Sequence, residues 1–294
     1  LGLTAEQTAA AERLRKSVNH LAVTIGERNT RQPQALAASA DYIEQAWRAL
    51  GLEPKRHGYA IGNESYDNLE VIIPGSTRAT ELVVIGAHYD SAVGTPGAND
   101  NGSGVAMLLE LSRRLAKYKP ARTLHLVAFV NEEPPYFRTN NMGSRVYANQ
   151  LAKKEKNVVA MLSLETIGYY TDADDSQHYP FPFSLFYPSR GNFVAFVANS
   201  ESVNLARDTV AHFRQSVDFP SKGAAAPSSI EGIDWSDQQG FWLNGYPALM
   251  VTDTAPNRYP HYHEPSDTPA QLDYEGMALV TDGVEAVVKH LLDR

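Results

Sequence analysis

Apolar residues repeat with two different periods along the chain, and segments of the two kinds alternate. A helical period of three to four residues covers 4–20 and 33–51, where Thr4 is placed to cap the first helix and Pro33 to begin the second. The same period returns in the later part of the chain. It predicts further helices at 103–118, 142–154, 202–215, 236–243 and 274–292.

Between these helices, unbroken or alternating apolar runs predict strands. The expected strands lie at 55–61, 68–73, 82–85, 124–130, 158–164, 183–187 and 247–253. Residues 220–233 are rich in Ala, Ser, Gly and Pro and predict a loop. Because strands and helices alternate almost throughout, we predict an α/β fold with one domain over residues 1–294. It would be a three-layer sandwich with a mixed, mostly parallel central sheet and helices on both faces, and residues 1–50 would form helices packed on it.

Composition excludes several classes of function. The net charge is -8 without a basic patch, so we do not expect a nucleic-acid partner, and no apolar run is long enough to span a membrane. The chain has no cysteine, which excludes disulfides, thiolate nucleophiles and thiolate zinc sites. The chain starts at Leu1 rather than at methionine, from which we expect a secreted or periplasmic location, with a cytoplasmic location as the alternative. The sequence does not predict the oligomeric state.

Potential metal ligands follow four of the predicted strands. Because the carboxyl ends of parallel strands meet at one edge of a sheet, these side chains are expected to converge there. The candidates are His88 and Asp90, Asp100 on the loop that follows them, Glu132 and Glu133, Glu165, and His263. A single residue of this kind at a strand end is more often an ordinary surface or turn residue. If that explanation held for the full set, several such residues would have to fall at successive strand ends by coincidence.

Their residue types fit a centre with two metal ions. Asp100 would bridge the ions, His88 and Glu165 would hold one of them, and Glu133 and His263 would hold the other. Nitrogen and oxygen ligands without sulfur suit two Zn²⁺ per chain, with cobalt or manganese as alternatives.

Two further acids have predicted roles beside the metal ions. Glu132 directly precedes the ligand Glu133, so we assign Glu132 as the general base that takes a proton from water and returns it to the leaving amine. Asp90 follows His88 by two residues and is placed to orient the imidazole ring through its other nitrogen.

These motifs resemble the two-zinc aminopeptidase family, peptidase family M28. The resemblance rests on Gly86-Ala87-His88-Tyr89-Asp90-Ser91, Gly97-Ala98-Asn99-Asp100-Asn101-Gly102-Ser103-Gly104, Asn131-Glu132-Glu133, Leu164-Glu165 and Tyr262-His263-Glu264-Pro265-Ser266-Asp267. It implies a sheet of about eight strands, a pair of zinc ions and removal of the first residue from peptides with a free N-terminus. It also selects His263 over His261 as the ligand and implies a cis peptide bond between Asp100 and Asn101.

The sequence departs from the family pattern in two places. Residues 134–144 form an insertion after Glu133 that should reshape the substrate pocket, and Gln238 stands where relatives often have histidine. Three alternatives remain: a single-zinc enzyme like glutaminyl cyclases, a carboxypeptidase of the same superfamily, or a non-catalytic binding domain. An apolar first residue is the expected substrate preference, because aromatic residues are frequent in 179–196 and 241–242.

Overall fold

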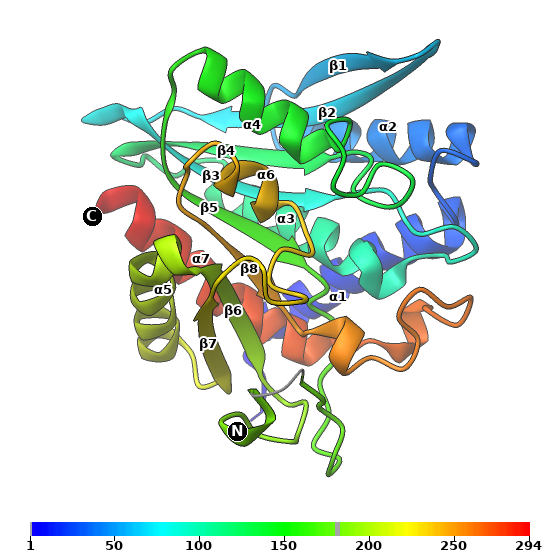
Figure 1. The fold of residues 1–294 in the computed structure, drawn as a ribbon, viewed down its shortest axis with the longest axis vertical. Coiled ribbons are helices and arrows are strands. Elements are labelled where there is room, and N and C mark those ends of the chain that lie inside the picture. The colour runs from blue at the N-terminus through cyan, green and yellow to red at the C-terminus, as the bar shows by residue number, and fades with distance from the viewer. Residues whose placement is uncertain (1, 180–182) are drawn as a thin grey trace.

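Eight strands form one sheet in the computed structural model, which describes residues 2–179 and 183–294 (Figure 1). The spatial order is β1-β2-β4-β3-β5-β8-β6-β7. The strands are β1 (Lys55–Ile61), β2 (Glu64–Ile73), β3 (Arg78–His88), β4 (Arg122–Phe129), β5 (Asn157–Glu165), β6 (Val194–Asn199), β7 (Ser221–Ala226) and β8 (Ala248–Thr252). The predicted α/β class and the sheet of about eight strands are confirmed.

The four central strands, β4, β3, β5 and β8, are parallel. In their register His88 pairs with Phe129, and Glu165 pairs with Thr252. The outer pairs make the sheet mixed, because β1, β2 and β4 are antiparallel neighbours and β6 is antiparallel to β8. The parallel centre brings the carboxyl ends of β3, β4 and β5 to one edge of the sheet.

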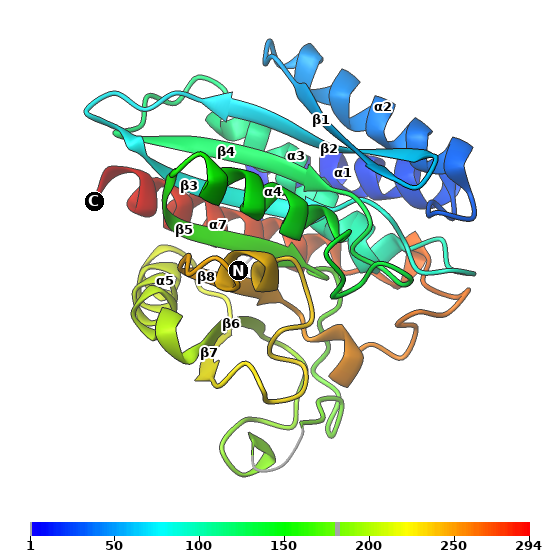
Figure 2. The ribbon, with the colours of Figure 1, turned by 45° about the horizontal axis from the view of Figure 1, so that its top comes forward.

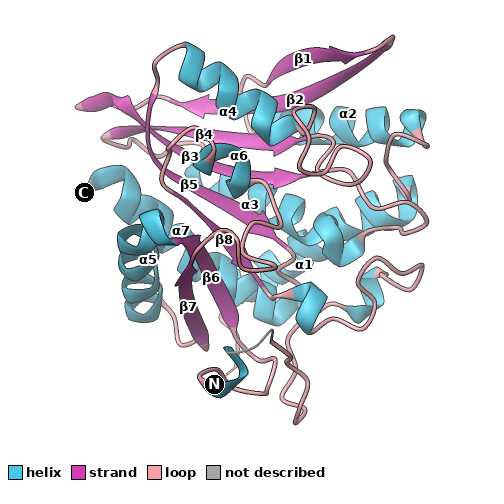
Figure 3. Cartoon of the chain, in the orientation of Figure 1, coloured by secondary structure: helices cyan, strands magenta, loops and turns pink. Residues whose placement is uncertain are grey.

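Helices cover both faces of the sheet (Figures 2 and 3). On one face pack α1 (Ala5–Asn19), α2 (Pro33–Ala49), α3 (Gly104–Leu115), α5 (Val203–Ser216) and α7 (Tyr274–Asp293), and on the other pack α4 (Gly143–Lys153) and α6 (Gln238–Trp242). Side chains of β3 alternate between the two cores: Val83 and Ile85 face the first group, and Leu82 and Val84 face the second. In the described part of the chain, no helix is both long and apolar enough to cross a bilayer.

Local signals place the helix boundaries well. Thr4 and Gln7 form a capping box at the start of α1, and Pro33 is the first residue of α2, as their sequence positions predict. A π-helical turn, His20–Ile25, extends α1 beyond its predicted end.

The prediction was wrong on the β6–β7 side of the sheet. Residues 183–187, predicted as a strand, contain a 3₁₀ turn at Phe183–Leu185, and neither β6 nor β7 was predicted. The sequence of β7, Ser-Lys-Gly-Ala-Ala-Ala, lacks the β-branched and aromatic residues that favour strands. Its strand conformation depends on parallel pairing with β6, from Val194–Ser221 to Asn199–Ala226.

A buried ion-pair network joins three helices behind the sheet. Glu110 of α3, whose side chain is only 3% exposed, accepts hydrogen bonds from Arg13 of α1 and from Arg113 and Arg114 of its own helix. Arg114 also pairs with two acids of α7, Asp282 and Glu285. Burial alone would raise the pKa of Glu110, but hydrogen bonds from the three arginines outweigh it and lower this pKa to about 2.

We expect Glu110→Gln to lower the free energy of unfolding at pH 7 by about 3 kcal/mol, because it leaves the buried Arg114 and the partly exposed Arg13 and Arg113 without their shared carboxylate. Since the folded-state pKa is depressed, this stabilisation is present above the unfolded pKa near 4.3 and is lost as the pH falls towards 2. The difference between the two proteins should therefore shrink over that range in urea unfolding. The exposed Glu12→Gln is the control, with an expected change within about 0.5 kcal/mol.

Candidate metal centre

The end of β3 and the segment between β3 and α3 carry three of the predicted site residues. His88 is the last residue of β3 and is fully buried, and Asp90 follows it. Asp100 lies in the segment Ala98–Ser103 before α3, at a kink where Asp100 and Asn101 have non-helical backbone angles. The peptide bond between Asp100 and Asn101 is cis, as the resemblance implied. The Asn101 amide donates to the carbonyl of Leu164 at 2.8 Å, which connects this segment to the end of β5.

The structure brings the five predicted ligands together in two groups that share Asp100. One group contains His88, Asp100 and Glu165, the other contains Asp100, Glu133 and His263, and in each group three possible ligand atoms lie within 4.8 Å of one another. His88 Nε2 lies 3.1 Å from Glu165 Oε2 and 3.4 Å from Asp100 Oδ1. His263 Nε2 lies 3.0 Å from Asp100 Oδ2 and 3.3 Å from Glu133 Oε1. Glu165 is the last residue of β5 and Glu133 follows the end of β4, while β3, which ends in His88, lies between these two strands.

Several atoms of these groups are buried without a hydrogen-bond partner. They are His88 Nε2, Asp100 Oδ1 and Glu133 Oε1. Unpaired buried polar atoms are costly, and atoms that converge on a common centre without hydrogen bonds are typical of metal ligands. The donor set of imidazole nitrogens and carboxylate oxygens fits zinc.

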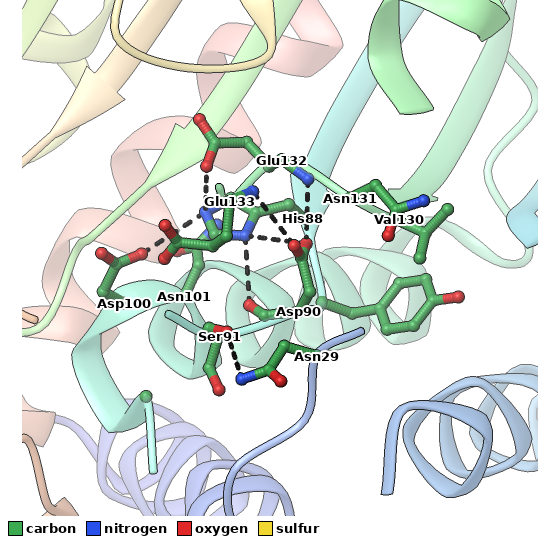
Figure 4. A network of polar contacts seen from close by, with 12 residues as sticks. Asn29, His88, Asp90, Ser91, Asp100, Asn101, Val130, Asn131, Glu132 and Glu133 are labelled. Atoms are coloured by element: carbon green, nitrogen blue, oxygen red, sulfur yellow. Dashed lines mark hydrogen bonds and ion pairs between the residues drawn. The ribbon is translucent and has the colours of Figure 1, made fainter. Parts of the chain in front are cut away.

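Asp90 contacts three residues of the site at once (Figure 4). Its carboxylate lies 3.4 Å from His88 Nδ1, where the sequence predicts a ring-orienting acid, and its own backbone carbonyl is nearer to that nitrogen at 3.2 Å. The same carboxylate accepts the backbone N–H groups of Glu132 at 3.2 Å and Glu133 at 3.0 Å. Asp90 thus also fixes the backbone of the predicted base and of a predicted ligand, which was not foreseen from the sequence.

Two supporting residues had no role in the sequence prediction. Asp267 accepts the backbone N–H groups of Asn99 at 2.8 Å and Asp100 at 3.1 Å. It also accepts the hydroxyl hydrogen of Tyr259 at 2.8 Å. The position of Asp267 at the end of the Tyr-His-x-x-x-Asp motif was the sequence signal from which this supporting role could have been predicted.

The second unpredicted supporting residue is Ser236, whose hydroxyl donates to Glu165 Oε2 at 2.6 Å. Nearby, Gln238 donates its amide to the carbonyl of Ile233, so it is held within its own loop. His261 contacts Ser266 and belongs to neither candidate ligand group, whereas His263 belongs to one of them.

The buried site holds more carboxylates than cations, and the pKa values reflect this imbalance. Burial, together with the charge of Asp100, raises the pKa of Glu133 to about 7, and burial with the neighbouring acids raises the pKa of Glu132 well above its usual range. Burial would lower the pKa of both histidines, but contacts with Asp100 and Glu133 raise that of His263 to about 10, and Glu165 and Glu132 raise that of His88. In the metal-free site, protons on these side chains partly neutralise the negative charge of the carboxylates, which bound metal cations would otherwise neutralise.

Comparison with known proteins identifies the family. The family model described as peptidase family M28 matches residues 68–288. The chain belongs to peptidase family M28. An uncharacterised protein of Escherichia coli, YfbL, is 40% identical, and the alignment covers 94% of this chain and 87% of that protein. A probable zinc metalloprotease of Pyrenophora teres is 31% identical over 65% of this chain, which spans 42% of that longer protein.

The fold of this M28 peptidase also matches solved structures. A zinc aminopeptidase from Bacillus subtilis superimposes with a TM-score of 0.76 at 16% identity, covering 97% of this chain and 95% of that one. At this identity the match supports the fold. The resemblance drawn from the motifs is confirmed by the family model, and the predicted enzyme class, a zinc-dependent peptidase, agrees with the family and with the names of its relatives.

Segment 134–144, predicted from the sequence to be an insertion, contacts one wall of a neighbouring cavity. Arg138, within 134–144, forms an ion pair with Asp234. Asp234 lies between Ile233 and Trp235, which line a cavity of about 120 Å³ that begins beside Glu165. The cavity lining is mostly apolar and aromatic. It includes Tyr179, Phe193, Val197, Ala224, Met250 and Tyr262.

We expect zinc affinity to rise with pH between about 6 and 8. Both site histidines hold protons in the metal-free chain because their pKa values are raised, and Glu133 holds one below its pKa of about 7. Zinc binds only the neutral imidazole and the deprotonated carboxylate. For each proton released on binding, the apparent zinc-binding constant should therefore rise by about tenfold per pH unit. Competition with a chelator of known affinity at each pH measures the slope. His261→Ala should leave it unchanged, and a pH-independent affinity would contradict the proton count.

Proposed function

We propose that this M28 peptidase is a metallo-aminopeptidase with two zinc ions and Glu132 as the general base. The observation that carries the proposal is the pair of three-residue ligand groups that share Asp100. His88 and Glu165 would hold one ion, Glu133 and His263 the other, and Asp100 would bridge them. A single-zinc cyclase would need only one of these groups, and a binding domain would need neither.

Bound zinc would supply the acidification of water and the polarisation of the scissile carbonyl. Glu132 would accept the proton of the attacking water and donate it to the leaving amine. Its surroundings suit both steps, because the side chain is buried and one carboxylate oxygen lies 3.8 Å from Nε2 of the proposed ligand His88. Asp90 would keep the base in place through the backbone N–H of Glu132.

The substrate class follows from the groups around the ligand cluster. A free α-amine is a cation, and the excess of buried carboxylates would attract it. The first side chain of the peptide would then enter the apolar cavity that begins beside Glu165. An engineered apolar cavity of roughly 150 Å³ holds benzene, so this space suits a leucine or phenylalanine side chain.

The deciding experiment combines zinc content with turnover. The wild-type chain, purified without chelator, should hold two zinc equivalents and cleave leucine anilide until a chelator removes the metal. Glu132→Gln should keep both equivalents and lose at least about 10²-fold in kcat, because only the proton carrier has changed. Glu133→Gln is the comparison, since it should lose metal as well as activity.

Other outcomes would redirect the proposal. Near-normal turnover by Glu132→Gln would reject this residue as the base. One zinc equivalent without cleavage would favour the cyclase alternative, and cleavage only from the carboxyl end of an N-acetylated peptide would favour the carboxypeptidase. No zinc binding, even after zinc is added back, would favour the binding domain.

Substrate preference tests the cavity. Burial of a leucine or phenylalanine side chain is worth about 1.5–3 kcal/mol, so kcat/KM for leucine anilide should exceed that for alanine anilide by about 10- to 100-fold. Ala224→Phe would fill the cavity and should remove most of this difference while sparing alanine anilide.

The control for this variant is Ala225→Phe. Ala225 is the next residue of β7, is exposed and does not line the cavity, so the preference for leucine should persist. Equal rates for leucine, alanine and glutamate anilides in the wild-type chain would show that the cavity does not receive the first side chain.

A further inference from the structure

Arg28 is a fully buried arginine outside the segment matched by the family model. It lies between the π-helical turn and α2, and its side chain reaches the loop after β3. Nε donates to the carbonyl of Tyr89 at 2.7 Å, Nη1 to that of Pro96 at 2.6 Å, and Nη2 to that of Gly97 at 2.8 Å. One guanidinium therefore connects both ends of the loop 89–97.

The residues beside Arg28 hold the middle of the same loop. The Asn29 amide donates to the carbonyl of Ser91 at 3.1 Å, a contact drawn in Figure 4. Glu27 accepts the backbone N–H of Gly94 at 2.9 Å. The backbones also pair, because Ser91 N–H donates to the carbonyl of Arg28 at 2.9 Å. Residues 27–29 thus form a clamp along the whole loop.

This loop separates two ligand residues of the candidate centre. His88 precedes it, and Asp100 follows three residues after its end. The turn at Gly97 has φ +61° and is tightly packed: an added Cβ would lie 2.4 Å from the carbonyl oxygen of Asp100 and 2.6 Å from Ser91 Cβ. The loop carbonyls turn inwards, and without Arg28 three of them would lose a charged donor.

The charge of Arg28 also suits this place. In the described part of the chain no carboxylate forms an ion pair with it, yet Asp267, Asp90 and Asp100 act on it through space and favour its cationic form. Burial lowers its pKa to about 10, so it stays charged at neutral pH. A lysine could keep the charge but not three separate hydrogen bonds in the fixed plane of a guanidinium.

We propose that Arg28 is a positioning residue of the metal centre. By fixing the loop 89–97, its side chain sets the spacing between His88 and Asp100, and the affinity for zinc then depends on an N-terminal segment that makes no contact with the metal. The inference rests on the zinc site of the proposed function and assigns the clamp of residues 27–29 to that site.

The test measures zinc affinity in the full chain by competition with a chromophoric chelator. Arg28→Gln and Arg28→Lys should each weaken zinc binding by about 10- to 100-fold, the usual effect of removing a group that orients metal ligands. Arg31→Gln changes an exposed arginine three residues away and should leave the affinity within about twofold. Asn29→Ala leaves the guanidinium in place but loses the amide contacts with the loop, with the Glu27 carboxylate and with the Arg31 N–H, and it should have a smaller effect in the same direction.

A purely structural role would give a different pattern. The melting temperatures of the metal-free and zinc-loaded proteins would then fall equally, and the zinc affinity would not change. That result for Arg28→Lys and Asn29→Ala would overturn the inference, even if Arg28→Gln does not fold. A wild-type chain that binds no zinc would overturn the proposed function together with it, whereas unchanged affinity in the variants would overturn this inference alone.

Discussion

The candidate site depends on buried carboxylates that bind backbone N–H groups. Asp90 holds the N–H groups of Glu132 and Glu133, and Asp267 holds those of Asn99 and Asp100. Such charge-assisted hydrogen bonds are strong, and a carboxylate with two oxygens can fix two successive residues. Each acid therefore joins loops that are distant in sequence, and the ligand positions follow from the backbone as much as from their own side chains.

The second constraint is electrostatic. The ends of the parallel strands bring together acids that have only two histidines among them, in a place largely removed from water. Burying uncompensated charge costs free energy, so we expect bound cations to neutralise these carboxylates. Arg28 contributes one fixed positive charge close to this cluster, and metal ions would contribute the rest.

The walls of the proposed substrate cavity come from segments outside the two candidate ligand groups. Segment 134–144 is attached to one of these walls, because Arg138 pairs with Asp234 in the loop that lines the cavity. The cavity wall also uses β6 and β7, the two strands that the sequence did not predict. Changes in these segments can alter which side chain fits while the ligand groups stay as they are.

The sequence by itself determined the parallel core and most helix boundaries, and it selected the candidate residues that the structure brings together. Those features have local causes, such as an apolar run that ends in His88 or Glu165, or a cap at Thr4. Only the tertiary structure decided the strand state of Ser221–Ala226, the contact of Ser236 with Glu165 and the clamp of Arg28 on the loop 89–97. The reason is physical: each of these features depends on a partner at least 27 residues away along the chain. Ser221 pairs with Val194, and Ser236 contacts Glu165, which is 71 residues away. No local pattern of polar and apolar residues encodes which distant backbone will supply a hydrogen bond.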